Sequence, residues 1–171
     1  HLYSRIALLD HVKKMELDEQ DGVVLSPDIG SAPMSQSYAK KLGIGFALID
    51  KRRTGHNKAE IANLIGNLKN KHAIIIDDMI DTAGTICNAA DIAIEKGALS
   101  VTAMATHPVL SGEAIQRLEN SSISKVIVGD TIELKKDKIF NKLEIITVEA
   151  VFADAIRHIV DGTSLSSMFK I

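Results

Sequence analysis

Residues 73–85 read Ala-Ile-Ile-Ile-Asp-Asp-Met-Ile-Asp-Thr-Ala-Gly-Thr, and this stretch decides the fold. The run 73–76 is short, continuous and rich in β-branched residues, which predicts a strand buried on both faces. Asp77 and Asp78 stand where that strand is expected to end. Residues 81–85 are small and hydroxyl-rich, and a helical pattern follows them. A strand, an acidic pair, a turn and a helix in this order predict a ligand site beyond the carboxyl end of a strand in an α/β sheet.

The chemistry of this stretch suits a sugar phosphate. A helix N-terminus with free N–H groups binds anions, and the hydroxyls of Thr82 and Thr85 are further donors for phosphate oxygens. The carboxylates of Asp77 and Asp78 can accept hydrogen bonds from sugar hydroxyls or hold a divalent cation. The alternative is an ordinary strand–turn–helix junction with Asp81 or Thr82 as the helix cap. A cap needs one such residue, so the two acids before it favour the binding site.

Composition sets the broad class of the protein. A length of 171 residues favours one domain with a real core. Hydrophobic residues make up 46% and charged residues 25%, as in globular proteins. The net charge of −2 argues against a nucleic-acid surface. Cys87 is the single cysteine, so an internal disulfide and a cysteine metal cluster are excluded. No apolar run approaches the length of a membrane span and no signal-peptide pattern opens the chain, so we expect a cytoplasmic protein.

A second strand–loop–helix unit lies earlier in the chain. Residues 23–25 predict a short buried strand, 26–31 a turn, and 32–42 a helix that ends at Gly43. Asp28 follows the strand, and Gly30 would let backbone N–H groups approach an anion. A Pro-Asp-x-Gly sequence is also common in ordinary turns, so both interpretations stay open.

A basic segment follows the next predicted strand, residues 45–50. It reads Lys-Arg-Arg-Thr-Gly-His-Asn from Lys51 to Asn57. A mobile loop of this kind can close over phosphates and stabilise negative charge in a transition state. A solvated charged turn is the alternative, and the neighbouring anion loops favour the functional reading. Residues 58–68 fit a helix or a strand, and we favour a strand.

The rest of the chain alternates strands with helices. Leu165–Phe169 form an apolar tail that needs a partner surface, and His107, after a strand, is structural or contacts substrate. Ser111 is the expected cap of a helix at 113–118. The short connections predict one α/β domain with a doubly wound, mostly parallel sheet flanked by helices. The other expected strands are 101–105, 125–128 and 143–148, and the other expected helices are 3–14, 86–96 and 149–160.

The assembled stretches resemble ribose-phosphate pyrophosphokinases, which are also called phosphoribosyl-pyrophosphate synthetases. The resemblance covers nearly the whole chain. Residues 77–85 alone also resemble type I phosphoribosyltransferases, which implies a phosphoribosyltransferase-like fold. The segments that carry the closer resemblance read Val-Leu-Ser-Pro-Asp-Ile-Gly at 24–30, Ala-Leu-Ile-Asp-Lys-Arg-Arg at 47–53, Thr-His-Pro-Val-Leu-Ser-Gly at 106–112 and Gly-Thr-Ser-Leu-Ser-Ser-Met-Phe at 162–169.

The resemblance implies a reaction and residue roles. Members of that family transfer the β,γ-diphosphoryl group of Mg-ATP to O1 of ribose 5-phosphate. Lys51 and Arg53 would be catalytic, and Asp28 would ligate Mg²⁺ within a pyrophosphate loop that includes Gly30 and Ser31. Such proteins assemble as homo-oligomers. The ribose-5-phosphate site would comprise Asp77, Asp78, Asp81, Thr82, Ala83, Gly84 and Thr85.

Two departures from the family pattern qualify these roles. Ser31 and Met34 stand where the family usually has a glycine and an arginine, so diphosphate binding is expected to be weaker. The family also has an N-terminal half with much of the adenine site, which predicts that residues 1–171 are a C-terminal domain with little activity alone. Two alternatives remain, a phosphoribosyltransferase of nucleotide salvage and a non-catalytic regulatory partner of a synthetase.

Overall fold

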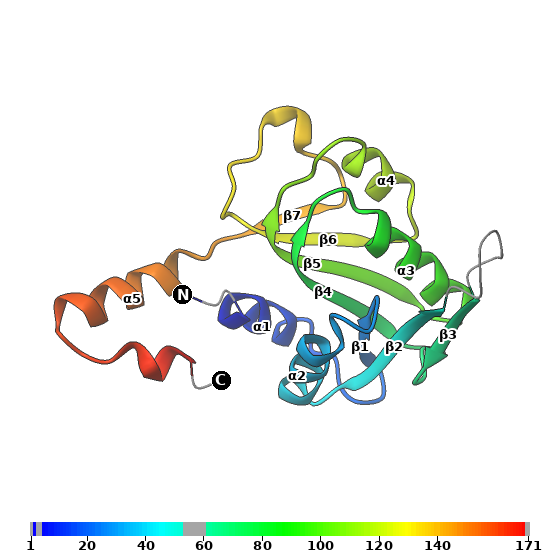
Figure 1. The fold of residues 1–171 in the computed structure, drawn as a ribbon, viewed down its shortest axis with the longest axis horizontal. Coiled ribbons are helices and arrows are strands. Elements are labelled where there is room, and N and C mark those ends of the chain that lie inside the picture. The colour runs from blue at the N-terminus through cyan, green and yellow to red at the C-terminus, as the bar shows by residue number, and fades with distance from the viewer. Residues whose placement is uncertain (1, 3–4, 53–60, 170–171) are drawn as a thin grey trace.

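The computed structural model describes residues 2, 5–52 and 61–169 (Figure 1). Within these residues a single sheet is flanked by helices. The strands are β1 (Gly22–Ser26), β2 (Gly45–Arg52), β3 (Ile61–Ile65), β4 (His72–Ile80), β5 (Ser100–Pro108), β6 (Lys125–Gly129) and β7 (Leu143–Ile146). The helices are α1 (Arg5–Lys13), α2 (Ala32–Leu42), α3 (Gly84–Glu95), α4 (Ala114–Asn120) and α5 (Glu149–Val160), with the 3₁₀ turns η1 (Lys136–Lys138) and η2 (Leu165–Phe169).

The sheet has the predicted doubly wound topology. Its strand order is β3-β2-β1-β4-β5-β6-β7, and the pairs are parallel except for β2 with β3. The chain moves outward from β1 to β3 and then returns to the other side of β1 with β4. The point where the order reverses therefore lies between β1 and β4, and ligands bind at such points in open α/β sheets.

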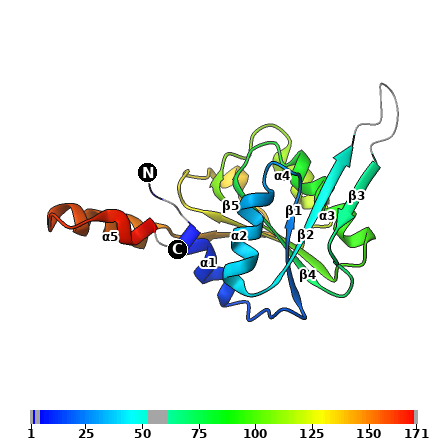
Figure 2. The same cartoon turned by 60° about the horizontal axis from the view of Figure 1, so that its bottom comes forward.

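Helices cover both faces of the sheet (Figure 2), and each face buries its own apolar cluster. One cluster packs α3 and α4 against inward residues such as Ile75 and Val128. The other packs α1 and α2 against residues such as Ile74 and Met104. Successive residues of β4 thus contribute to opposite faces, which explains why its apolar run is continuous rather than alternating. Cys87, near the start of α3, is buried in the first cluster.

β4 is longer than its apolar run predicted. The expectation that it ends at Asp77 and Asp78 is wrong, because it continues to Ile80. Pairing with β5 extends the strand, since Asp77 lies opposite Ala105 and Met79 opposite His107. The two acids are therefore held by a paired strand and not by a free loop.

β2 also continues beyond its predicted end at residue 50. Lys51 and Arg52 pair with Ala62 and Ile61 of the antiparallel β3, so this part of the basic segment is strand rather than loop. The prediction of a strand within residues 58–68 is confirmed. Gly66 follows β3 at a φ of +102°, and a Cβ there would lie 2.7 Å from Phe46 O, so no other residue fits.

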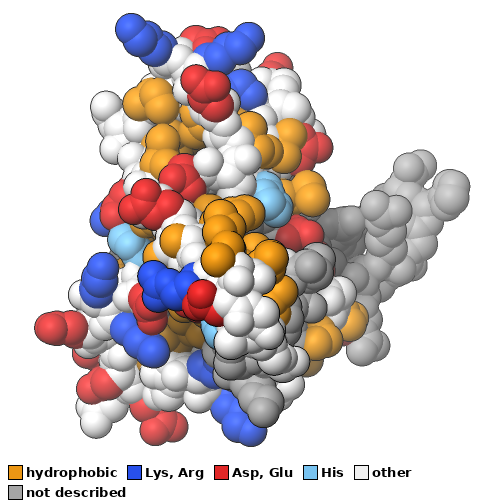
Figure 3. Space-filling model, turned by 90° about the vertical axis from the view of Figure 1, so that its left-hand side faces the viewer, with side chains coloured by type: hydrophobic (Ala, Val, Ile, Leu, Met, Phe, Trp, Pro, Cys, Tyr) orange, Lys and Arg blue, Asp and Glu red, His pale blue; other side chains and the backbone are white. Residues whose placement is uncertain are grey.

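The C-terminal elements stand apart from the sheet in both ribbon views (Figures 1 and 2). α5 has the predicted bounds, and its residues Val151 and Ala155 form a small cluster with Met168 of η2. The apolar tail thus contacts α5, as its composition required. Figure 3 shows hydrophobic side chains on this side of the molecule. Among the described residues of α5 the large exposed apolar side chains are Phe152, Ile156, Ile159 and Val160.

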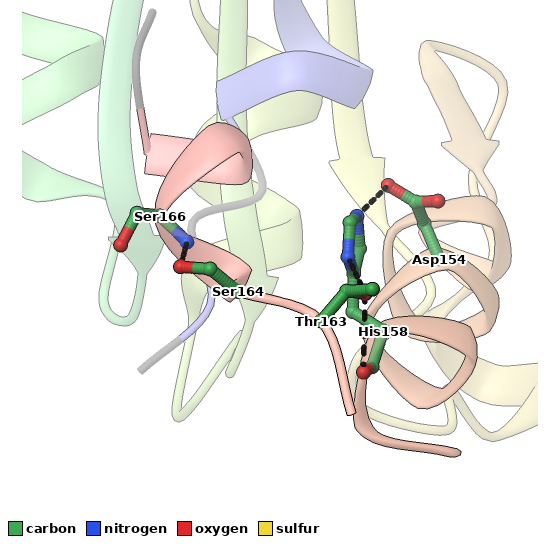
Figure 4. Close-up of polar contacts among 5 residues, drawn as sticks. All are labelled: Asp154, His158, Thr163, Ser164 and Ser166. Carbon is green, nitrogen blue, oxygen red and sulfur yellow. Dashed lines mark hydrogen bonds and ion pairs between the residues drawn. The ribbon is translucent and has the colours of Figure 1, made fainter. Parts of the chain in front are cut away.

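A polar contact closes the C-terminal end of α5 (Figure 4). The hydroxyl of Thr163 donates to His158 O at 3.3 Å, and Nδ1 of His158 lies 2.6 Å from the same hydroxyl. Because that hydroxyl proton is used, Nδ1 is the donor of the shorter bond. Nε2 of His158 lies 4.0 Å from Asp154 one turn earlier. These contacts fix the turn that leads from α5 to η2.

Within the described part of the chain, no helix is both long enough and apolar enough to cross a membrane.

Candidate sugar-phosphate site

The loops after β1 and β4 lie side by side at the edge where the strand order reverses. β1 pairs with β4 in parallel, so both strands present their carboxyl ends at the same edge. The loop after β1 carries Asp28, Gly30 and Ser31, and the loop after β4 leads into α3. The topology therefore brings together the two loops that sequence reasoning had singled out separately.

A pocket of about 180 Å³ lies in the loop between β4 and α3. Its volume is below the roughly 300–1,000 Å³ of typical sites for drug-sized ligands, so it suits a small group such as a phosphate with part of a sugar. The predicted ribose-5-phosphate residues gather here with the exception of Asp78. The lining residues are Asp77, Met79, Ile80, Asp81, Thr82, Ala83, Gly84, Thr85 and Ile86.

The first turn of α3 presents backbone donors at this pocket. α3 begins at Gly84, two residues earlier than predicted, and Ala83 precedes it in the left-handed region with a φ of 62°. The N–H of Cys87 donates to Ala83 O at 3.0 Å. The N–H groups of residues 84–86 lie before that bond and have no acceptor inside the helix. Neither Asp81 nor Thr82 is the cap residue, so the interpretation as an ordinary capped junction is wrong.

The acidic pair has one partly buried and one exposed member. Asp77 is partly buried and lines the pocket, whereas Asp78 is exposed and does not. The N–H of Asp78 donates to Oδ1 of Asp77 at 2.9 Å. Burial raises the pKa of Asp77 from 3.8 to about 6, and the carboxylates of Asp78 and Asp28 add to the rise. Asp28, on the loop after β1, thus contributes to the raised pKa of an acid on β4.

The loop after β1 is held by its own side chains. The backbone N–H and the hydroxyl of Ser31 both donate to Oδ1 of Asp28, each at 2.9 Å. The buried Ser26 hydroxyl donates to Asp28 O at 2.8 Å. Gly30 does not have a positive φ, so its conformation alone does not require glycine. Ser31 therefore orients the Asp28 carboxylate through a hydroxyl that a glycine would lack.

The donor set fits a magnesium ion only with help from a ligand. No group of three or more His, Cys, Asp or Glu side chains that could hold a metal is found among the described residues. Mg²⁺ is commonly bound by one or two carboxylates together with waters and substrate phosphates. Asp28 offers one such carboxylate, with Oδ1 already accepting two hydrogen bonds.

Two side chains outside the predicted set form hydrogen bonds to the pocket loop. The hydroxyl of Ser111 donates to Oδ1 of Asp81. Nη1 of Arg117 on α4 donates to Thr82 O at 2.9 Å. The expectation that Ser111 caps α4 is wrong, because Glu113 is the residue before the helix. The sequence carried no motif for these contacts, since a side chain that reaches a backbone carbonyl needs no particular spacing.

His107 lies at the same sheet edge, opposite Met79 of the pocket. Thr131 donates its hydroxyl proton to Thr106 O at 2.9 Å, so Nδ1 of His107, 2.8 Å from that hydroxyl, is the donor. The ring is thus anchored through Nδ1 while the residue remains exposed. This hydrogen bond orients the ring, and contact of His107 with a substrate stays a prediction.

The basic segment is described in part. Lys51 has its backbone in β2, paired with β3, and its side chain lies outside the described part. Arg53, and the remainder of the predicted loop to residue 57, lie outside the described residues.

A larger cavity of about 610 Å³ is lined by α1 and α5, including His11 and Arg157. It shares no lining residue with the pocket between β4 and α3. By volume alone this cavity would be the preferred candidate for the binding site. It does not, however, contain the carboxylates and the helix N-terminus that the sequence predicts to lie together after β4.

Comparisons with known proteins agree on one family. The model of the family described as "Phosphoribosyl synthetase-associated domain" matches residues 51–170. A ribose-phosphate pyrophosphokinase of Chlorobaculum tepidum is 46% identical over 99% of this chain and 52% of its own length. The crystal structure of phosphoribosylpyrophosphate synthetase from Mycobacterium smegmatis is 36% identical, with a TM-score of 0.81 over 91% of this chain and 50% of that one.

A more distant neighbour supports the fold alone. The purine phosphoribosyltransferase of Pyrococcus horikoshii matches with a TM-score of 0.52 at 16% identity, over 85% of both chains. The chain spans about half the length of the curated relatives that it matches. The chain therefore belongs to the phosphoribosyl synthetase-associated domain family.

Proposed function

We propose that this chain binds ribose 5-phosphate in the pocket between β4 and α3. The 5-phosphate would accept hydrogen bonds from the N–H groups of residues 84–86 and the hydroxyls of Thr82 and Thr85. Asp77 and Asp78 would accept hydrogen bonds from the ribose hydroxyls, with Asp81 in the same loop. The observation that carries this proposal is the small pocket that joins an unsatisfied helix N-terminus to a partly buried carboxylate.

The wider proposal is that the chain is the ribose-5-phosphate half of a ribose-phosphate pyrophosphokinase. Such an enzyme transfers diphosphate from ATP to ribose 5-phosphate. The relatives that carry this name support the proposal, because they match this chain over nearly its whole length. The other half of such a protein would supply much of the adenine site. We propose further that the full protein is a homo-oligomer.

Phosphoryl transfer depends on positioning and charge neutralisation more than on covalent chemistry by the protein. Asp28 would hold Mg²⁺ together with substrate oxygens, beside Gly30 and Ser31 of the pyrophosphate loop. The ion would supply neutralisation of the phosphate charge. Lys51 and Arg53 would stabilise the transferred oxygens.

A non-catalytic partner of a synthetase is a second candidate. Met34, at the position where the family usually has an arginine, is partly buried against the apolar cluster of α1 and α2. It offers no cation to a diphosphate. Mixing this chain with an active synthetase and measuring mass by light scattering tests that candidate, which fails if no complex forms.

Calorimetry tests the binding of ribose 5-phosphate in the presence of Mg²⁺. The unmodified chain is expected to bind, and Asp77→Asn/Asp78→Asn is expected to weaken binding about tenfold or more, since each lost hydrogen bond to a charged group is worth roughly 1.5–3 kcal/mol. Asp137→Asn on η1, an exposed residue that does not line the pocket, is the matched control. Equal affinity in all three proteins would contradict the proposed site.

A further inference from the structure

Three successive carbonyls of the pocket loop are tied to the segment that follows β5. They belong to residues 80, 81 and 82. The N–H of Leu110 donates to the first at 2.9 Å, and the N–H of Ser111 donates to the second at 3.1 Å. Nη1 of Arg117 donates to the third at 2.9 Å. The loop is therefore held along its length from one side, by donors that are 30 or more residues away in sequence.

Peptide geometry turns this restraint into a direction for the loop N–H groups. The described chain contains no cis peptide bond, and in a trans peptide the C=O and the following N–H point in opposite directions. With the carbonyls of 80–82 directed at residues 110–117, the N–H groups of 81–83 point away from that segment. These residues line the pocket together with 84–86. The hydrogen bonds to these three carbonyls thus favour a continuous set of backbone N–H donors at the small pocket.

The side chain of Lys138 restrains the segment after β5 that donates these hydrogen bonds. Nζ of Lys138, in η1, donates to Val109 O at 2.9 Å and to Leu110 O at 2.8 Å. Leu110 is almost fully buried and has a φ of 49°, which non-glycine residues rarely adopt. Such a conformation persists only when the surroundings fix it, and Lys138 and the buried Leu110 side chain supply that restraint.

We propose that Arg117 and Lys138 are positioning residues for the phosphate of the ligand. They act through the backbone of residues 80–82 and do not touch the ligand. By holding the loop before binding, they reduce the ordering that binding would otherwise require. The proposal rests on the proposed function, because it takes the pocket to be the site of a sugar phosphate.

The planar guanidinium of Arg117 makes it possible to distinguish a role in positioning the loop from a role as a positive charge alone. Its guanidinium reaches Thr82 O through Nη1 and Glu113 Oε2 through Nη2, the latter at 3.1 Å. A lysine keeps the positive charge but cannot make both contacts in this geometry. If Arg117 acts by position, Arg117→Lys should behave like Arg117→Met. If it acts only as a cation near a phosphate, the lysine should restore binding.

The test is calorimetric titration of ribose 5-phosphate, with Mg²⁺, into the whole chain and its variants. Arg117→Met, Arg117→Lys and Lys138→Met should each weaken binding about five- to tenfold, somewhat less than the loss of a direct hydrogen bond between a charged donor and the ligand, because both residues act through the backbone. Arg157→Met, an exposed arginine of α5, should leave affinity unchanged. The affinities of these variants for inorganic phosphate should fall in the same order, because the substitutions affect binding of the phosphate group and not of the sugar.

Amide hydrogen exchange of residues 82–86, measured without ligand, separates positioning from a loss of global stability. Faster exchange confined to this loop, with an unchanged melting temperature, supports the proposal. Variants that bind as tightly as the unmodified chain, or a lysine that restores binding, would overturn it while leaving the proposed function intact. Failure of the unmodified chain to bind ribose 5-phosphate would overturn both.

Discussion

Replacement of Asp77 by asparagine should make the protein more stable at neutral pH, although it removes a predicted ligand contact. The pKa of Asp77 is raised to about 6 in the folded chain, chiefly by burial. A raised pKa means that the folded state binds the proton more tightly than the unfolded state. The resulting stabilisation is complete below the unfolded pKa and is lost as pH rises through the folded value.

The size of the effect follows from the shift. A rise from 3.8 to about 6 corresponds to about 3 kcal/mol if it is taken at face value. Asp77 is only partly buried, so solvent screening reduces this to about 1–1.5 kcal/mol. Asparagine keeps an oxygen that can accept from the N–H of Asp78, and it removes the ionised state. The variant should therefore match the unmodified protein near pH 4 and exceed it by about 1 kcal/mol near pH 8.

Urea unfolding at a series of pH values measures this difference directly. Comparison with Asp137→Asn, an exposed residue of η1, removes the contribution of the other titrating groups. The reasoning is refuted if Asp77→Asn is less stable than the unmodified protein near pH 8. It is also refuted if the difference between the two does not change with pH.

Three further predictions address the packing of the site and the core. A Cβ at Gly129 would lie 2.6 Å from Thr106 O, so Gly129→Ala should lower the free energy of unfolding by about 2 kcal/mol in urea denaturation. Ser111→Ala should weaken ribose-5-phosphate binding about threefold, because it frees the Asp81 carboxylate; a calorimetric affinity equal to that of the unmodified chain would contradict this. Burial raises the pKa of the Cys87 thiol, so its reaction with a disulfide reagent near pH 8 should be slow in the folded chain and fast in urea; equal rates would show that Cys87 is accessible.

Much of the fold was predictable because local patterns and topology agree. The bounds of α2 and α5 follow from apolar periodicity and, for α2, from Gly43, which ends the helix at a φ of 67°. The parallel, doubly wound order follows from alternating strands and helices with short connections. Strand ends were predicted less well, because register between strands decides them. Asp77 belongs to β4 only because β5 remains paired beyond it.

The pocket loop was predictable from its composition, since small residues and hydroxyls at the start of a helix directly indicate an anion-binding site. The side chains that hold this loop in place were not predictable. Arg117 and Lys138 reach backbone carbonyls from elements distant in sequence. Any carbonyl accepts such a bond, so the sequence gives no spacing or partner type by which to find it. The same holds for Ser31, whose hydroxyl contact to Asp28 emerges only once the turn is folded.

The most direct test of the sugar-phosphate site is a map of backbone amide NMR shifts during titration with ribose 5-phosphate and Mg²⁺. The proposed site predicts the largest changes at residues 82–86, with further changes at Asp77 and Asp78 and little change in α5. Titration with inorganic phosphate should reproduce the shift changes at residues 82–86 and cause almost no change at Asp77 and Asp78. Shifts centred on the cavity between α1 and α5, or no shifts at all, would contradict a sugar-phosphate site between β4 and α3.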